Sequence, residues 1–194
     1  MRQLTGPAAR RASGALLIAG FAALIPAVAF WAASQTGTSY VPPTFPARAS
    51  AVFMIAGVSL TLLGLIAFDV VLWKAGDRVL SGLGTAAYGV AGVSWVTEAG
   101  RGLALHESTY DLEVVFVVAG GLSMLAFGAS VIRTGAIPRW AGWLAVGWSV
   151  AWLILFAMRR STAPLAPQLV PLLLGVVLLR PSGDRFHRPL DLAA

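Results

Sequence analysis

Long apolar stretches separated by short polar turns constrain this chain more than any other feature. Of its 194 residues, 58% are hydrophobic and only 11% are charged, whereas a soluble domain carries about 25% charged residues. An apolar run of about 20 residues can cross a bilayer as a helix. The sequence therefore predicts an all-α, polytopic transmembrane helix bundle of about six spans. The expected spans cover residues 14–33, 51–73, 80–99, 112–132, 140–158 and 164–179.

The chain divides into one predicted domain and a tail. Residues 1–180 contain all the expected spans and form a single transmembrane helical domain, and residues 181–194 form a polar tail. Prolines at positions 42, 43 and 46 predict an extended loop after the first span. The basic start and first apolar run also fit a secretory signal peptide. A transmembrane helix is favoured, because the run is long enough to cross a bilayer and further spans follow it.

The distribution of basic residues predicts the orientation of the bundle. With six spans, both termini lie on one side, which carries ten of the 14 Lys and Arg residues. The positive-inside rule then places both termini and the tail in the cytoplasm. Prolines at positions 164, 167 and 171 leave an alternative, in which the last segment is re-entrant and the C-terminus lies outside. The four basic residues on the opposite side are Arg48, Arg101, Arg159 and Arg160.

Composition excludes several classes of site. The absence of cysteine excludes disulfides, thiolate metal sites and cysteine nucleophiles. The two histidines, His106 and His187, lie far apart, and Tyr110 stands where a His-Glu-x-x-His zinc motif needs its second histidine. We therefore expect no metal and no cofactor. The charge of +6 comes from residues that flank the spans, so the expected partner is the lipid bilayer and not nucleic acid.

Ionisable residues gather at the expected outer ends of the third and fourth spans. A carboxyl group partly removed from water can deliver a proton at neutral pH, and Glu98 lies closest to the membrane interior. Trp95, one turn before Glu98, would form a wall of the pocket. An ion-pair network that ties the helix ends together is the alternative interpretation. The candidate catalytic residues are Glu98, His106, Asp111 and Glu113, and the candidate ligand-binding residues are Trp95, Arg101 and Arg159.

Two other intramembrane polar residues have both a structural and a functional interpretation. Asp69 lies near Lys74 and Arg78, which predicts an interfacial salt bridge rather than a proton-coupling carboxylate. Gln168 is flanked by prolines that leave backbone carbonyls unpaired, and its side chain is expected to satisfy one of them. The alternative for Gln168 is the polar lining of a pocket.

Small and aromatic residues predict how the helices pack. Glycines spaced seven residues apart lie on one helix face, where they allow the close approach of another helix or leave room for an apolar ligand. A stripe of tryptophans spaced by multiples of four residues follows the fifth span, at Trp140, Trp148 and Trp152. These side chains are expected to pack in the core or against lipid, or to form an aromatic wall for a ligand. The glycine pairs are Gly57 and Gly64, Gly82 and Gly89, and Gly121 and Gly128.

One turn carries a resemblance to other proteins. Residues 133–144 read Arg-Thr-Gly-Ala-Ile-Pro-Arg-Trp-Ala-Gly-Trp-Leu. Gly135 is expected to end one helix, Pro138 to open the next, and Arg139 to meet lipid head groups. The segment resembles an inter-helix turn of uncharacterised bacterial six-helix membrane proteins, a family of unknown function. The resemblance implies the architecture and a bacterial source. Together with the predicted spans, this leads us to expect a multi-pass location in a bacterial cell (inner) membrane.

The sequence does not reveal a specific activity, and three functions remain as hypotheses. The first is a structural or regulatory partner that binds a cytoplasmic protein through the basic tail. The second is a membrane-embedded enzyme with cyclase- or isomerase-like acid–base chemistry, or a binding protein, for an apolar isoprenoid or lipid. A small transporter ranks third, because no inverted repeat is visible.

Overall fold

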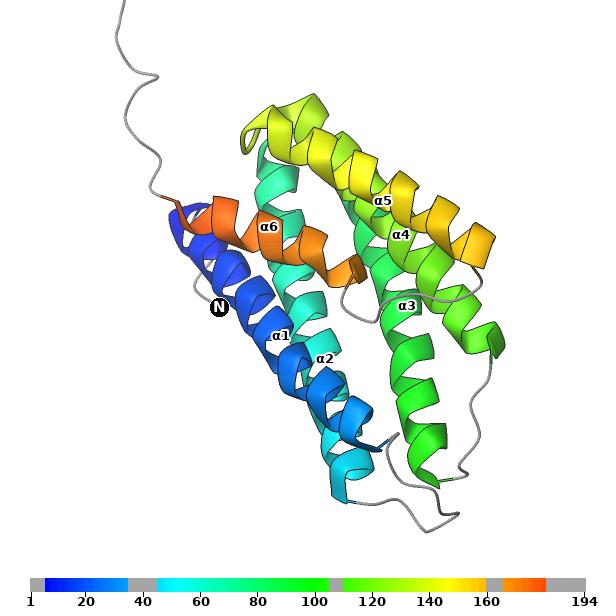
Figure 1. Ribbon diagram of the computed structural model, residues 1–194. Helices are drawn as coiled ribbons and strands as arrows, with labels where there is room; N and C mark the ends of the chain where they lie inside the picture. Colours follow the sequence, from blue (N-terminus) through cyan, green and yellow to red (C-terminus); the bar gives the residue numbers. More distant parts are fainter. Residues whose placement is uncertain (1–5, 35–44, 105–109, 160–165, 181–194) are drawn as a thin grey trace, which may run out of the picture.

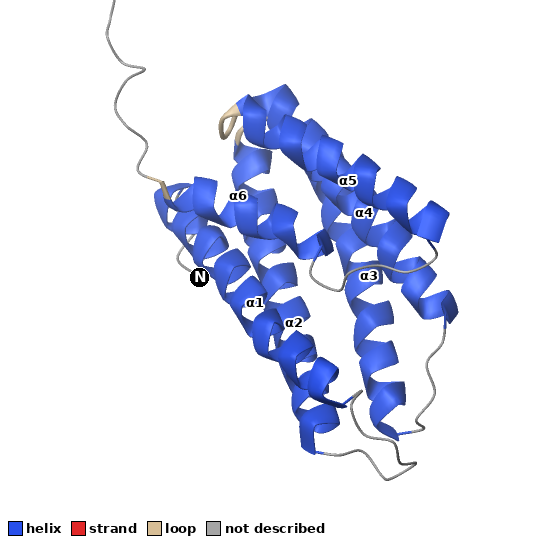
Figure 2. Ribbon diagram, in the orientation of Figure 1, coloured by secondary structure: helices blue, strands red, loops and turns tan. Residues whose placement is uncertain are grey.

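The computed structural model describes residues 6–34, 45–104, 110–159 and 166–180, and every regular element in these ranges is a helix (Figures 1 and 2). This confirms the predicted all-α class. The elements are α1 (Gly6–Ser34), α2 (Phe45–Lys74), α3 (Val79–Ala104), α4 (Tyr110–Thr134), α5 (Arg139–Arg159), the short 3-10 helix η1 (Ala166–Gln168) and α6 (Leu169–Leu179).

Helices α1 to α5 are long and apolar enough to cross a membrane. Helix α5 has 21 residues, which at about 1.5 Å per residue cover roughly 30 Å. Helix α6 has only 11 residues and covers about 16 Å by the same rise. In the described residues, the expected span at residues 164–179 therefore consists of η1 followed by this short helix. The described part of the chain has five helices long enough to cross a membrane and one shorter apolar helix, where six spans were expected.

Helix α6 occupies one half of the bundle, between α1 and α5 (Figure 1). It begins near half depth, because the indole nitrogen of Trp148, in the middle of α5, donates to the Ala166 carbonyl at 2.8 Å. It ends beside the start of α1, where Arg10 Nε donates to the Leu178 carbonyl at 3.1 Å. The described chain therefore begins and ends at the same end of the bundle.

Close approaches at glycine hold neighbouring helices together. Gly57 and Gly64 of α2 face α1, where a Cβ would lie 2.6 Å from Leu24 and 2.8 Å from Leu17, respectively. The hydroxyl of Ser13 in α1 also donates to the Gly64 carbonyl at 2.8 Å. These contacts confirm the packing predicted for this pair.

The other two glycine pairs differ from each other. Gly121 and Gly128 of α4 face α5, and a Cβ on Gly128 would lie 2.9 Å from the Gly142 carbonyl oxygen. The packing prediction is wrong for Gly82 and Gly89 of α3, where a Cβ would meet nothing within 4 Å. Their spacing places both on one face of α3, but no other described helix approaches that face.

The turns between α2 and α3 and between α4 and α5 lie at the same end of the bundle as the start of α1, and they follow from their residue types. Gly135 adopts φ +64°, and its N–H donates to the Val131 carbonyl at 2.9 Å, which ends α4. Helix α5 then begins at Arg139, directly after Pro138, as predicted for this turn. Asp77 caps α3, because its Oδ1 accepts from the backbone N–H groups of Val79 and Leu80, each at 3.1 Å.

Candidate functional site

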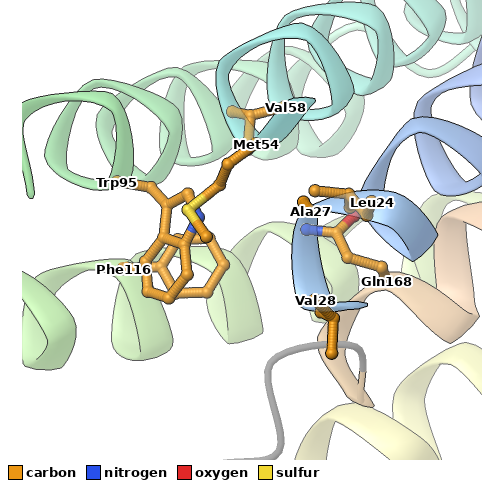
Figure 3. Close-up of a pocket in the computed structure, with 8 residues that line it drawn as sticks. All are labelled: Leu24, Ala27, Val28, Met54, Val58, Trp95, Phe116 and Gln168. Atoms are coloured by element: carbon orange, nitrogen blue, oxygen red, sulfur yellow. The ribbon is translucent and has the colours of Figure 1, made fainter. Parts of the chain in front are cut away.

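A cavity lies beyond the start of α6, next to η1, and Figure 3 shows the residues that line it. Its wall on the side of α6 is η1, the short turn from which α6 starts. Its other walls come from the C-terminal halves of α1 and α3 and the N-terminal halves of α2 and α4. The lining residues are Leu24, Ala27, Val28, Met54, Val58, Trp95, Phe116 and Gln168.

The cavity has a buried floor and a half-buried rim. The buried side chains include Leu24, Val58 and Phe116, each at most 5% exposed, whereas Val28, Met54 and Trp95 are partly exposed. These three residues therefore form the rim of the cavity, with Val28 on one side and Met54 and Trp95 on the other (Figure 3).

Aromatic rings form one wall of the cavity. The rings of Trp95 and Phe116 lie with their centroids 4.2 Å apart and their planes tilted by 32°. Phe116 in turn meets Trp152 of α5 edge-on, at 6.2 Å. This wall offers a flat, polarisable surface to an apolar molecule.

The enclosed space is small as the side chains stand. Its volume of about 10 Å³ is close to what one water molecule needs. Met54 reaches from α2 toward Trp95 and Phe116, on one side of the cavity (Figure 3). Methionine is unbranched and changes rotamer easily, so a turn of Met54 is the simplest way to enlarge the cavity.

The polar group of the cavity is the Gln168 amide. Its Oε1 accepts from the Tyr88 hydroxyl at 3.3 Å, and its Nε2 lies 3.3 Å from the same hydroxyl oxygen. Both residues are only 2% exposed. Thr61 of α2 is also buried, and its hydroxyl donates to the Gly57 carbonyl at 2.9 Å. A buried polar contact therefore links η1 and α3 behind the cavity.

Among the predicted catalytic and ligand-binding residues that the structure describes, Trp95 alone lines the cavity. Glu98, Arg101 and Glu113 are half-buried, and each makes an interaction within the protein. The structure thus places Glu98 one turn beyond the cavity wall rather than inside it. Asp111 is exposed at the start of α4. His106, the side chain of Arg159 and the tail at residues 181–194 lie outside the described residues.

The structure differs from the favoured predictions for Gln168 and for Asp69. Gln168 lines the cavity and contacts Tyr88, which is the pocket-lining interpretation. The guanidinium of Arg78 lies over the Trp73 ring, 5.1 Å from its centroid. Asp69 Oδ1 is buried with no hydrogen-bond partner among the described residues, and Arg78, one of the two basic residues expected near it, lies over Trp73 instead.

The tryptophan stripe of α5 divides between two environments. Trp140 and Trp148 are 46% and 42% exposed, whereas Trp152 is 4% exposed and packs against Phe116. Only Trp152 therefore has a core role, and it supports the aromatic wall from behind.

Sequence reasoning missed Tyr88, Met54 and Phe116. Tyr88 could have been found, because it lies seven residues before Trp95 and therefore on the same face of α3. Met54 and Phe116 carry no comparable signal, since apolar residues fill every face of these spans.

Comparison with known proteins finds no match: no family model, no curated protein and no solved structure matches the chain. The resemblance of residues 133–144 to a bacterial family therefore stays a prediction.

Proposed function

We propose that this protein binds a small apolar molecule in the cavity beyond α6. The observation that carries the proposal is the half-length last helix, which leaves an open-sided cavity between α1, α2, α3 and α4. Seven of the eight lining side chains are apolar and one is a buried amide. Sites for small molecules in proteins have this composition, with an apolar wall and few polar groups. An isoprenoid or lipid chain is the class of molecule that a bilayer supplies to such a cavity.

A pair of matched substitutions tests the binding. A photoreactive alkyl diazirine labels the protein, and the part of this labelling that excess dodecane suppresses reports binding in the cavity. Val28→Phe places a ring at the rim, and we expect it to reduce this part severalfold. Val90→Phe makes the same change on the exposed face of α3, where Val90 is 55% exposed, and should leave this labelling unchanged. Labelling would be measured by intact mass spectrometry of the purified protein. Equal labelling of Val28→Phe and wild type would contradict binding in the cavity.

A second candidate function is acid–base catalysis on the bound molecule. The observation that favours it is the position of Glu98, one helical turn after the cavity residue Trp95. A partly buried carboxyl at the rim could protonate a group that extends out of the cavity. In this function Glu98 is the general acid. His106, Asp111 and Glu113 assist it, and Arg101 and Arg159 bind a polar part of the substrate.

We also propose that the basic end of the bundle faces the cytoplasm of a bacterial cell, with the chain in the inner membrane. The proposal is supported by the basic residues that gather at the α1 start, the α2–α3 turn, the α4–α5 turn and the α6 end. In the described residues these are Arg10, Arg11, Lys74, Arg78, Arg133, Arg139 and Arg180.

Single cysteines test this orientation, because the chain has no cysteine of its own. A membrane-impermeant maleimide should label Asp111→Cys in intact cells and Arg78→Cys only after lysis. Both residues are exposed, at opposite ends of the bundle. The reverse pattern would show that the basic end faces outward.

A further inference from the structure

Tyr88 does not use the full hydrogen-bonding capacity of the Gln168 amide. A glutamine amide has two N–H donors and a carbonyl oxygen with two lone pairs. In the described residues its side chain meets one partner, the Tyr88 hydroxyl, and both contacts measure 3.3 Å. An O–H···O hydrogen bond is usually about 2.7 to 2.8 Å long, so this contact is weak. At least one N–H of Gln168 is therefore left without an acceptor from the described side chains.

The cavity is the space beside the amide from which an acceptor for this N–H can come. The other seven lining residues have apolar side chains apart from the indole N–H of Trp95, which is a donor and not an acceptor. Gln168 is 2% exposed, so bulk water does not reach it freely. A buried donor without an acceptor is costly, which favours any occupant that supplies one.

The same lining argues for an uncharged occupant. No Lys, Arg, Asp or Glu is among the eight lining residues. An anionic group beside Gln168 would be buried without a cation, and a cation without an anion, and either is unfavourable. The aromatic wall of Trp95 and Phe116 suits an apolar or planar body next to the polar group.

We propose that the molecule bound in the cavity carries a neutral oxygen, such as a ketone or quinone carbonyl, that accepts a hydrogen bond from Gln168 Nε2. This specificity rests on the binding function proposed above. The carbonyl lies at half depth against η1, and the apolar body extends past Met54 toward the rim of the cavity.

Three probes of equal chain length test the specificity on the full-length protein in one detergent. They are methyl decyl ketone, dodecane and dodecanoate, and the readout is the rise in melting temperature with probe concentration, converted to Kd. We expect the ketone to bind about three- to tenfold more tightly than dodecane, as one net neutral hydrogen bond allows. Dodecanoate should bind more weakly than the ketone, because its charge would be buried unpaired.

Two variants identify the group responsible. Gln168→Leu should bind dodecane as wild type does and lose the preference for the ketone. Tyr88→Phe removes the competing partner of the amide and should keep or increase that preference, which provides a test if Gln168→Leu does not fold. Val28→Phe should bind none of the probes, which separates binding in the cavity from partition into the micelle.

The outcomes separate the two proposals. If no probe stabilises the wild type more than Val28→Phe, both the binding function and the carbonyl specificity are overturned. If dodecane and the ketone bind with equal affinity in the cavity, binding stands and the carbonyl specificity is overturned, with a water molecule as the partner of Gln168. A ketone preference that persists in Gln168→Leu also overturns it.

Discussion

Gly142→Ala is expected to lower the free energy of unfolding by about 1 to 3 kcal/mol, the usual cost of overpacking a tight contact. A Cβ at this position would lie 2.7 Å from the Gly128 carbonyl oxygen and 2.8 Å from Ile132 Cγ1. A backbone oxygen cannot turn away as a side chain can, so α4 and α5 have to move apart. The measurement is reversible unfolding by SDS titration in mixed micelles.

Gly147→Ala is the matched control on the same helix. A Cβ on Gly147 would meet nothing within 4 Å, and this glycine is exposed. The variant should be as stable as wild type or more stable by up to about 1 kcal/mol, because alanine favours a helix more than glycine does. Equal effects of the two substitutions would contradict the close approach of α4 and α5 at Gly142.

Tyr88→Phe is expected to cost about 1 to 3 kcal/mol of stability, because it leaves the buried Gln168 amide without its side-chain partner. The double variant Tyr88→Phe/Gln168→Leu removes both polar groups and should be near wild-type stability. The coupling between the two sites, measured as a double-mutant cycle with the same SDS titration, should therefore be stabilising. A double variant at least as unstable as Tyr88→Phe would show that the cost comes from lost packing and not from the unpaired amide.

The five long helices could be predicted from the sequence, because the thickness of a bilayer sets a minimum length for an apolar run that crosses it. Residues 51–73 and 112–132 exceed that length, and each became a long helix. The last run, residues 164–179, is near the limit and contains three prolines. Its helical length depends on where the 3-10 turn at Ala166–Gln168 gives way to α6, which the apolar run alone does not show.

Glycine spacing predicted faces but not the partners of those faces. Gly57 with Gly64 and Gly82 with Gly89 have the same spacing, yet only the first pair meets another helix. The difference lies in how the helices are arranged around one another, and a seven-residue repeat within one helix does not contain that information.

Only part of the candidate site could be predicted, again because the sequence does not show which helix faces meet. Charged residues at the C-terminal end of α3 and the start of α4 predicted a site that included Trp95, which does line the cavity. The cavity itself is built from apolar side chains of four long helices and η1. Such residues have no distinguishing pattern in a chain where 58% of residues are hydrophobic, so only the tertiary arrangement shows which of them meet.

The most direct measurement is the site of attachment of the alkyl diazirine in wild-type protein, mapped by peptide mass spectrometry. If the cavity binds an apolar molecule, the labelling that excess dodecane suppresses falls on Met54 and Trp95, at the rim, and on Phe116 behind them. Labelling confined to lipid-facing residues such as Leu83 and Val93, which are 59% and 68% exposed, with none at Met54 or Trp95, would contradict the proposed function.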